Sequence, residues 1–236
     1  MKQASMVRVG GLALVFGAVA FMAVFAFLAA RFDYPEVLDG PAATVLPSLL
    51  ETGASGRAAW AFYAFLPLIW LPAGVGAYCA LHRSRSGLML LAPQCAVLAA
   101  ISMMLGLMRW PTIHWHMAQL QATATPDQQE VIAAIFDGLN AYLGNYIGEF
   151  LGELSFNGFF LLSSWTLIRD RSTGRWVGIA GLVVGVAGLV GMCRNVTVAV
   201  APVAAFNNYL LPLWMIVFGV VLLRWRTSDA SSDDQV

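Results

Sequence analysis

Apolar residues run along this chain in long blocks that short polar stretches separate. A helix needs about 20 apolar residues to cross roughly 30 Å of hydrocarbon, and six blocks are long enough. These blocks cover residues 9–30, 60–81, 88–108, 142–168, 176–198 and 207–223. We therefore predict an all-α, polytopic membrane helix bundle with six transmembrane helices. It would form a single domain over residues 1–226, followed by a disordered acidic cytoplasmic tail over residues 227–236.

The first block could be confused with a secretory signal peptide. Lys2 and Arg8 precede it, and the small residues Ala29 and Ala30 close it. Its apolar run is longer than the 7 to 15 residues of a signal core. We therefore interpret it as a retained transmembrane helix.

Composition agrees with a membrane protein. Hydrophobic residues make up 59% of the 236 residues and charged residues only 11%, against roughly a quarter charged in an ordinary soluble domain. The lipid bilayer is thus the expected surrounding partner. The formal net charge is zero, so no basic field favours nucleic-acid binding.

The basic residues predict the orientation, because Lys and Arg concentrate in short cytoplasmic loops. With the N-terminus inside, the cytoplasmic side would carry Lys2, Arg8, Arg83, Arg85, Arg169, Arg171, Arg175, Arg224 and Arg226. The other side would carry only Arg31, Arg57, Arg109 and Arg194. This asymmetry predicts that both termini are cytoplasmic.

The longer connections, 31–59 and 109–141, would then lie on the outer face. In the second of them, Thr125, Pro126 and Gln128 have the spacing of a helix-capping box with proline at the first helical position. Three- and four-residue steps relate the apolar residues that follow, Val131, Ile132, Ile135, Phe136 and Leu139. This spacing predicts an interfacial amphipathic helix over the outer face. Prolines in the first connection predict short, broken helical turns.

The fourth block contains a polar stripe. Asn145, Glu149, Glu153 and Asn157 follow one another at four-residue steps, so they share one side of a helix. A parallel track of small residues, Gly144, Gly148 and Gly152, would let a neighbouring backbone approach closely. Carboxylates inside a membrane helix are costly and almost always pair within the bundle.

Arginines at a similar depth are the candidate partners of these acids. Counting about 1.5 Å per residue from the inner helix ends brings Arg109, Glu149 and Arg194 to one level. The predicted cluster consists of Arg109, Asn145, Glu149, Glu153, Asn157, Arg194 and Asn195, with Asn207 and Asn208 nearby. Two interpretations stay open: the charges fix the helix arrangement, or they line an outward-facing pocket for a small polar ligand or a proton.

No pattern predicts catalytic residues, a metal site or a cofactor. His114 and His116 are two residues apart, which on a helix points their side chains about 200° apart. No histidine lies in the middle of a predicted span, which disfavours a haem held between helices.

Two stretches carry a family resemblance: Arg109-Trp110-Pro111, and residues 140–152 with their Tyr-x-Gly-x-x-Ile-Gly-Glu-x-Leu-Gly pattern. There the sequence resembles a family of bacterial six-helix membrane proteins known only as a domain of unknown function. The resemblance implies a bacterial inner-membrane protein and gives weight to Arg109, Tyr142 and Glu149. It brings no activity with it.

Three hypotheses about function follow. The leading one is a protein that binds a small polar ligand or a proton at the Glu/Arg cluster, as a sensor or minor transporter. The second is a membrane-embedded regulatory partner of the anti-sigma type. A membrane enzyme acting on lipid or quinone is the least favoured, since no nucleophile and base stand at a recognisable spacing. The sequence leaves a homo-oligomer open.

Overall fold

The computed structural model describes residues 3–82, 87–169 and 175–225. Every regular element in this part of the chain is a helix, which confirms the all-α class. Several predictions fall outside the described residues: Lys2, Arg83, Arg85, Arg171 and Arg226 as inner positive charges, and the acidic tail 227–236.

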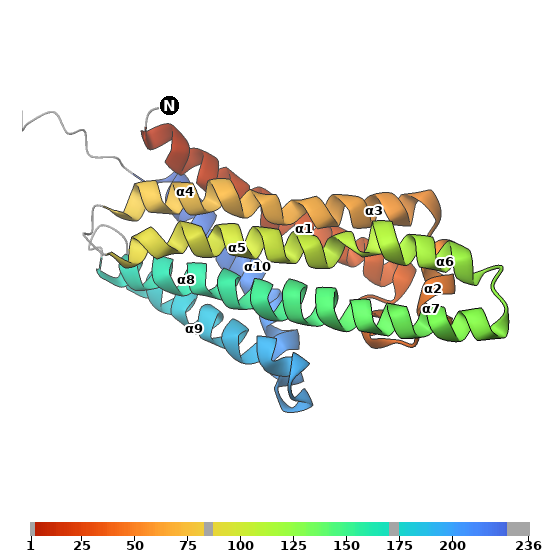
Figure 1. Ribbon diagram of the computed structural model, residues 1–236. Helices are drawn as coiled ribbons and strands as arrows, with labels where there is room; N and C mark the ends of the chain where they lie inside the picture. Colours follow the sequence, from red (N-terminus) through yellow and green to blue (C-terminus); the bar gives the residue numbers. More distant parts are fainter. Residues whose placement is uncertain (1–2, 83–86, 170–174, 226–236) are drawn as a thin grey trace, which may run out of the picture.

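The long helices follow one another around a ring in chain order (Figure 1). The helices of this ring are α1 (Gln3–Phe32), α4 (Trp70–Leu81), α5 (Leu88–Met108), α8 (Gly152–Arg169), α9 (Arg175–Gly191) and α10 (Ala201–Leu223). Each of them packs against the next, and α10 returns to pack against α1. Aromatic rings fill the interior: those of Trp70 and Phe156 lie 4.3 Å apart, and those of Trp214 and Phe218 are stacked at 5.7 Å.

A long helical hairpin extends beyond this ring. After α5 the chain continues through a π-helical segment, η4 (Trp110–His114), into α6 (Trp115–Gln121). It returns through α7 (Pro126–Leu139) and a second π-helical segment, η5 (Asn140–Leu151), directly into α8. We call the turn at 122–125 the hairpin end of the molecule. The opposite end, where α1 begins and α10 ends, is called the terminal end.

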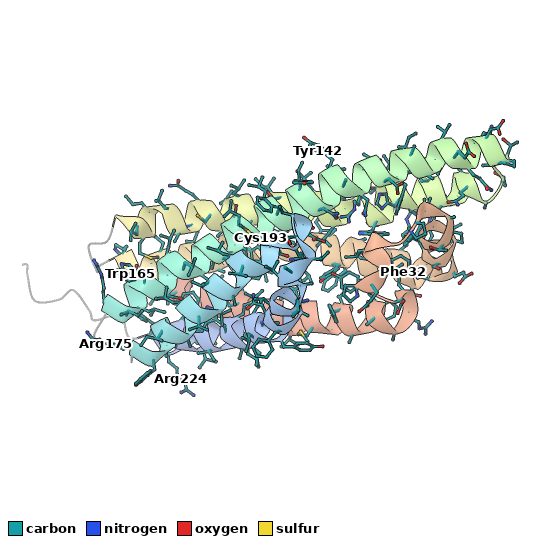
Figure 2. The ribbon with its side chains drawn as sticks, turned by 90° about the horizontal axis from the view of Figure 1, so that it is seen from below. Phe32, Tyr142, Trp165, Arg175, Cys193 and Arg224 are labelled. Carbon is teal, nitrogen blue, oxygen red and sulfur yellow. The ribbon has the colours of Figure 1, made fainter. Side chains whose placement is uncertain are left out.

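The turn between α9 and α10 lies part-way along this hairpin (Figure 1). It consists of two short 3-10 turns, η6 (Met192–Asn195) and η7 (Val198–Val200). Figure 2 likewise shows Cys193 and Tyr142 part-way along the length of the molecule, with Trp165, Arg175 and Arg224 at the terminal end. The hairpin therefore projects well past the α9–α10 turn.

The amphipathic helix predicted after Thr125 starts where expected. Its capping box is confirmed, with the Gln128 side chain accepting a hydrogen bond from the Thr125 N–H at 2.9 Å. It differs from the prediction in two respects. The preceding helix does not end at Met108 but runs on to Gln121, and α7 is not a separate helix, because it continues in line into η5 and α8. Packing along the antiparallel partner holds these segments straight.

Two other predicted spans are also longer in the structure, because their helices begin earlier in the chain. The second span begins at Gly53 as α3 (Gly53–Phe65) and reaches α4 through the 3-10 turn η2 (Leu66–Ile69). The last span begins at Ala201. The proline-containing first connection forms η1 (Glu36–Asp39) and α2 (Ala42–Glu51), which confirms the expected broken helical turns.

A second core holds the hairpin end together. The end of α1 and the elements α2, α3, α6 and α7 surround it. Its largest fully buried side chains are those of Trp60, Trp110 and Phe136. The indole rings of Trp60 and Trp110 are stacked at 4.9 Å, so this half of the molecule is as well packed as the ring of helices.

Five helical stretches of the described chain are long and apolar enough to cross a membrane. They are Gln3–Phe32, Gly53–Leu81, Leu88–Gln121, Arg175–Asn195 and Val198–Leu223. The predicted fourth span, 142–168, is helical but is not among the five. Its stripe of asparagines and glutamates lowers its hydropathy, and both glutamate side chains bond to Arg194, which follows α9.

Candidate functional site

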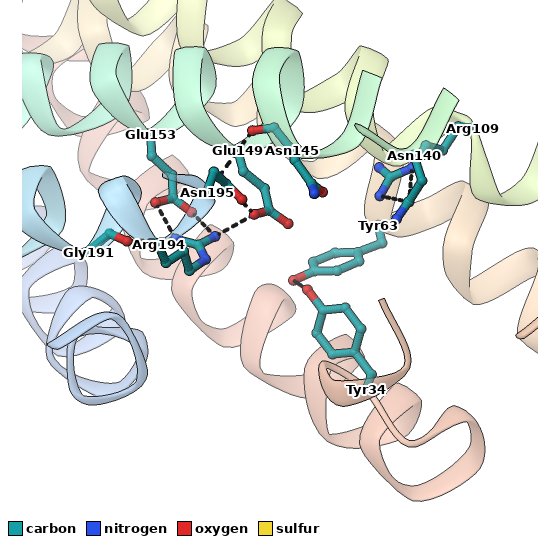
Figure 3. Close-up of polar contacts among 10 residues, drawn as sticks. All are labelled: Tyr34, Tyr63, Arg109, Asn140, Asn145, Glu149, Glu153, Gly191, Arg194 and Asn195. Atoms are coloured by element: carbon teal, nitrogen blue, oxygen red, sulfur yellow. Dashed lines mark hydrogen bonds and ion pairs between the residues drawn. The ribbon is translucent and has the colours of Figure 1, made fainter. Parts of the chain in front are cut away.

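Arg194 joins the two glutamates of the polar stripe. Its guanidinium makes two hydrogen bonds to the Glu153 carboxylate, Nη1 to Oε2 at 2.8 Å and Nη2 to Oε1 at 2.7 Å. Nη2 also donates to Glu149 Oε2 at 2.9 Å (Figure 3). The side chains of Arg194, Glu149 and Glu153 remain 29%, 24% and 24% exposed. One guanidinium thus serves two carboxylates at a partly open site.

Local structure explains how these residues meet. The α-helix α9 ends at Gly191, and the tighter turn η6 that follows carries Arg194 over the polar stripe. Nη1 of Arg194 also donates to the Gly191 carbonyl at 3.3 Å, which anchors the side chain to the end of its own helix. A charged side chain at a helix end can reach a neighbouring helix without entering the packed core.

Two of the predicted asparagines adjoin the ion pairs. Asn195 Nδ2 donates to the Asn145 carbonyl at 3.1 Å and to Glu149 Oε2 at 3.3 Å. Asn157 lies one turn further along α8, where its Nδ2 donates to the Glu153 carbonyl and its Oδ1 packs against Gly188. Asn157 therefore supports the helix interface and does not touch the carboxylates.

Arg109, predicted as part of the same cluster, is bonded elsewhere. Its guanidinium donates to Asn140 Oδ1 at 2.9 and 3.2 Å and to the Gly106 carbonyl, and it lies over the Trp110 ring. Arg109 is 5% exposed and makes no contact with either glutamate, although its charge acts on Glu149 from a distance. Asn140 also donates to the Leu38 carbonyl at 2.8 Å, so this pair ties the hairpin to η1.

Two tyrosines that the sequence prediction missed face the site. The hydroxyls of Tyr34 and Tyr63 lie 3.5 Å apart and within electrostatic reach of Glu149. Figure 3 shows both hydroxyls directed toward the side of the Glu149 carboxylate that Arg194 leaves open. Burial raises the pKa of the Tyr34 hydroxyl well above its ordinary value, so it stays protonated. No sequence spacing relates these residues to Glu149.

Both π-helical segments adjoin the site. The segment η5 contains Asn145 and Glu149, and Arg109 immediately precedes η4. Such segments are rare in proteins and frequently occur at functional sites. Their wider turns change the direction in which successive side chains point.

The two histidines of the hairpin lie apart, as their spacing predicted. His114 is fully buried, with its ring 4.8 Å from that of Trp110 and 4.6 Å from that of Phe136, whereas His116 is exposed. Among the described residues, no group of three or more His, Cys, Asp or Glu side chains is placed to hold a metal ion.

The helical ring and its apolar spans define a multi-pass helical membrane protein. The chain belongs to the DUF4386 family, a domain of unknown function, whose family model matches residues 9–225. This confirms the resemblance to an uncharacterised family. Neither the curated proteins nor the solved structures contain a match.

Proposed function

We propose that this protein is a bacterial inner-membrane protein that binds a small polar ligand or a proton at the site of Glu149, Glu153 and Arg194. It acts as a sensor or a minor transporter. The site faces outward, and both termini are cytoplasmic. The predicted fourth span, 142–168, completes the set of six, because Glu149 and Glu153 are paired with Arg194 rather than directed at lipid.

Exposed aromatic residues support this placement in the membrane, since Trp and Tyr concentrate at both membrane interfaces. Trp165 is exposed at the terminal end and Tyr142 near the level of the α9–α10 turn, and Trp176, Tyr146 and Tyr209 are exposed as well. From Trp165 to Tyr146 the helix rises roughly 28 Å, which is close to the thickness of the hydrocarbon layer. The ion pairs then lie at the outer boundary, and the hairpin end projects beyond it.

The main support for the proposal is the excess of negative charge at the site. Two carboxylates share one guanidinium, and Arg109 is bonded to Asn140 and Gly106 instead. Within the described residues, Glu149 Oε1 accepts no hydrogen bond. An acidic site with a free acceptor atom favours a proton or a ligand that carries a positive charge.

The hydroxyls of Tyr34 and Tyr63 add uncharged polar partners beside Glu149. A small ammonium group donates up to three hydrogen bonds, which suits a free carboxylate oxygen with hydroxyl groups in its vicinity. The ligand class that fits best is therefore a small organic ammonium ion. A proton bound to the Glu149 carboxylate would neutralise the same negative charge without any organic ligand.

Thermal unfolding of the purified protein in detergent, with methylammonium chloride as the probe, tests this proposal. Methylammonium should raise the unfolding temperature of the wild type more than an equal concentration of potassium acetate does. Glu149→Gln should remove this stabilisation, because it removes the negative charge and keeps the side-chain size. Glu51→Gln is the matched control, since Glu51 is an exposed carboxylate on α2.

Equal stabilisation of the wild type and Glu149→Gln by methylammonium would contradict the proposal. Uptake of labelled methylammonium into proteoliposomes separates the two roles. Uptake that depends on Glu149 indicates a transporter, whereas binding without uptake indicates a sensor.

A further inference from the structure

A shallow cavity of about 370 Å³ lies between α3 and the start of η4. On the α3 side it is lined by the small residues Ala54, Ala58 and Ala61, and on the other side by Met108 and Thr112. The small α3 side chains leave a space that a slender apolar group can enter. This cavity shares no lining residue with the Glu149 site.

Arg57 provides the only charge among the residues that line this cavity. Its Nε donates to the Pro111 carbonyl at 3.0 Å, and its guanidinium lies over the Trp115 ring at 5.3 Å. The side chain is exposed, and its two Nη groups make no hydrogen bond within residues 3–82, 87–169 and 175–225. A guanidinium fixed in this way presents a preorganised pair of donors to an anion.

The cavity lies where the character of the exposed surface changes. Toward the terminal end, the exposed neighbours are large and apolar, including Phe62 on α3 and Leu105 on α5. Toward the hairpin end, the exposed residues include the polar Ser55 and His116 as well as the apolar Ile113. Such a change marks the boundary between acyl chains and headgroups, so Arg57 lies at headgroup level.

We propose that this cavity binds an anionic phospholipid. The lipid phosphate accepts hydrogen bonds from the free Nη groups of Arg57. One acyl chain occupies the space beside the α3 alanines and continues along Phe62 and Leu105. Basic residues in pockets between transmembrane helices recognise acidic headgroups by this chemistry.

Charge complementarity favours an anionic lipid over a zwitterionic one. No acidic residue lines the cavity, so a choline or ethanolamine cation would find no partner there and would lie near Arg57. Inorganic phosphate would use the guanidinium alone and leave the apolar lining uncovered. An anionic phospholipid would occupy both parts of the site: its phosphate would bind the Arg57 guanidinium, and its acyl chain would cover the apolar lining.

Native mass spectrometry of the intact protein, titrated with phosphatidylglycerol or phosphatidylcholine, tests the assignment. The wild type should retain phosphatidylglycerol about ten- to a hundredfold more tightly than Arg57→Gln does, the effect of losing charge-assisted hydrogen bonds. Ala58→Leu should weaken lipid retention by filling the cavity, and Ala58 is exposed, so the fold tolerates the change. Arg31→Gln is the matched control, because Arg31 is another exposed arginine, placed 6.0 Å from the Phe27 ring centre.

The expected pattern is a preference for phosphatidylglycerol that Arg57→Gln and Ala58→Leu reduce and that Arg31→Gln leaves unchanged. Three results would overturn the proposal: equal retention of both lipids by the wild type, retention by Arg57→Gln at the wild-type level, or retention unaffected by Ala58→Leu. Displacement of the lipid by millimolar inorganic phosphate alone would also overturn it, since free phosphate would then be the ligand.

Discussion

Gly106 of α5 and Gly148 of η5 pack backbone against backbone, and a methyl group added at Gly148 would lie 2.8 Å from the Gly106 Cα atom. This contact explains the small-residue track of the fourth predicted span. Without side chains at these positions, the two arms of the hairpin approach closely enough for Arg109 to lie beside Gly144 and bond to Asn140. The position of the polar residues on η5 therefore depends on this glycine pair.

Gly148→Ala should destabilise the protein by about 1–3 kcal/mol, because the added methyl group forces the two backbones apart. Gly138→Ala is the control, since no atom lies within 4 Å of the methyl group it would add, and its higher helix propensity should be neutral or slightly stabilising. Thermal unfolding in detergent measures both variants. Equal unfolding temperatures for the two would contradict the packing described for this pair.

Asn140→Ala should lower the free energy of unfolding by about 1.5–3 kcal/mol, the usual cost of losing a hydrogen bond to a buried charged group. It removes the acceptor of two Arg109 hydrogen bonds and the donor to the Leu38 carbonyl. Asn208→Ala, at an exposed position of α10, should have little effect. Chemical unfolding in mixed micelles provides the comparison.

Arg194→Gln should destabilise the bundle by about 1–3 kcal/mol, since two partly buried carboxylates would then face each other without a cation. Glu153→Gln added to this variant should recover much of the loss. A double-mutant cycle on thermal unfolding measures the coupling between the two positions. Additive effects would show that the ion pair seen at 2.7 Å contributes nothing to stability.

Gly188→Ala should be costly in the wild type and much less so together with Asn157→Ala. A methyl group at Gly188 would lie 2.0 Å from Asn157 Oδ1, so the two positions compete for one space at the α8–α9 interface. Residues in direct contact commonly couple by about 0.5–3 kcal/mol. Unfolding temperatures of the four members of this cycle test the contact.

The proposed orientation predicts which residues a membrane-impermeant thiol reagent reaches in intact cells. In a background without Cys79, Cys95 and Cys193, Thr123→Cys at the hairpin end should be labelled. Ser5→Cys, near the start of α1, should be protected until the cells are opened. The reverse pattern would place the N-terminus outside and overturn the orientation derived from the arginines.

The helical class and the approximate extent of most spans could be predicted from the amino-acid sequence alone. This was possible because a helix crossing lipid needs a continuous apolar run, and such runs are visible without knowledge of the neighbours. The start of the third span at Leu88 was predicted, and the capping box marked the start of α7. The depth of a residue along its helix could also be predicted, because the rise per residue is constant. This rise brought Glu149 and Arg194 to one level, and the structure places them in contact.

Which of the polar groups at that depth contact one another depends on how the helices pack. Arg109 lies near the same depth as Glu149, but its guanidinium packs beside Gly144 and donates to Asn140 instead. Tyr34 and Tyr63 face the site from elements far away in the sequence, within electrostatic range of Glu149. Rise along a helix is local and follows from residue count. Rotation about the helix axis and the choice of neighbours depend on packing between helices, which no single stretch of sequence specifies.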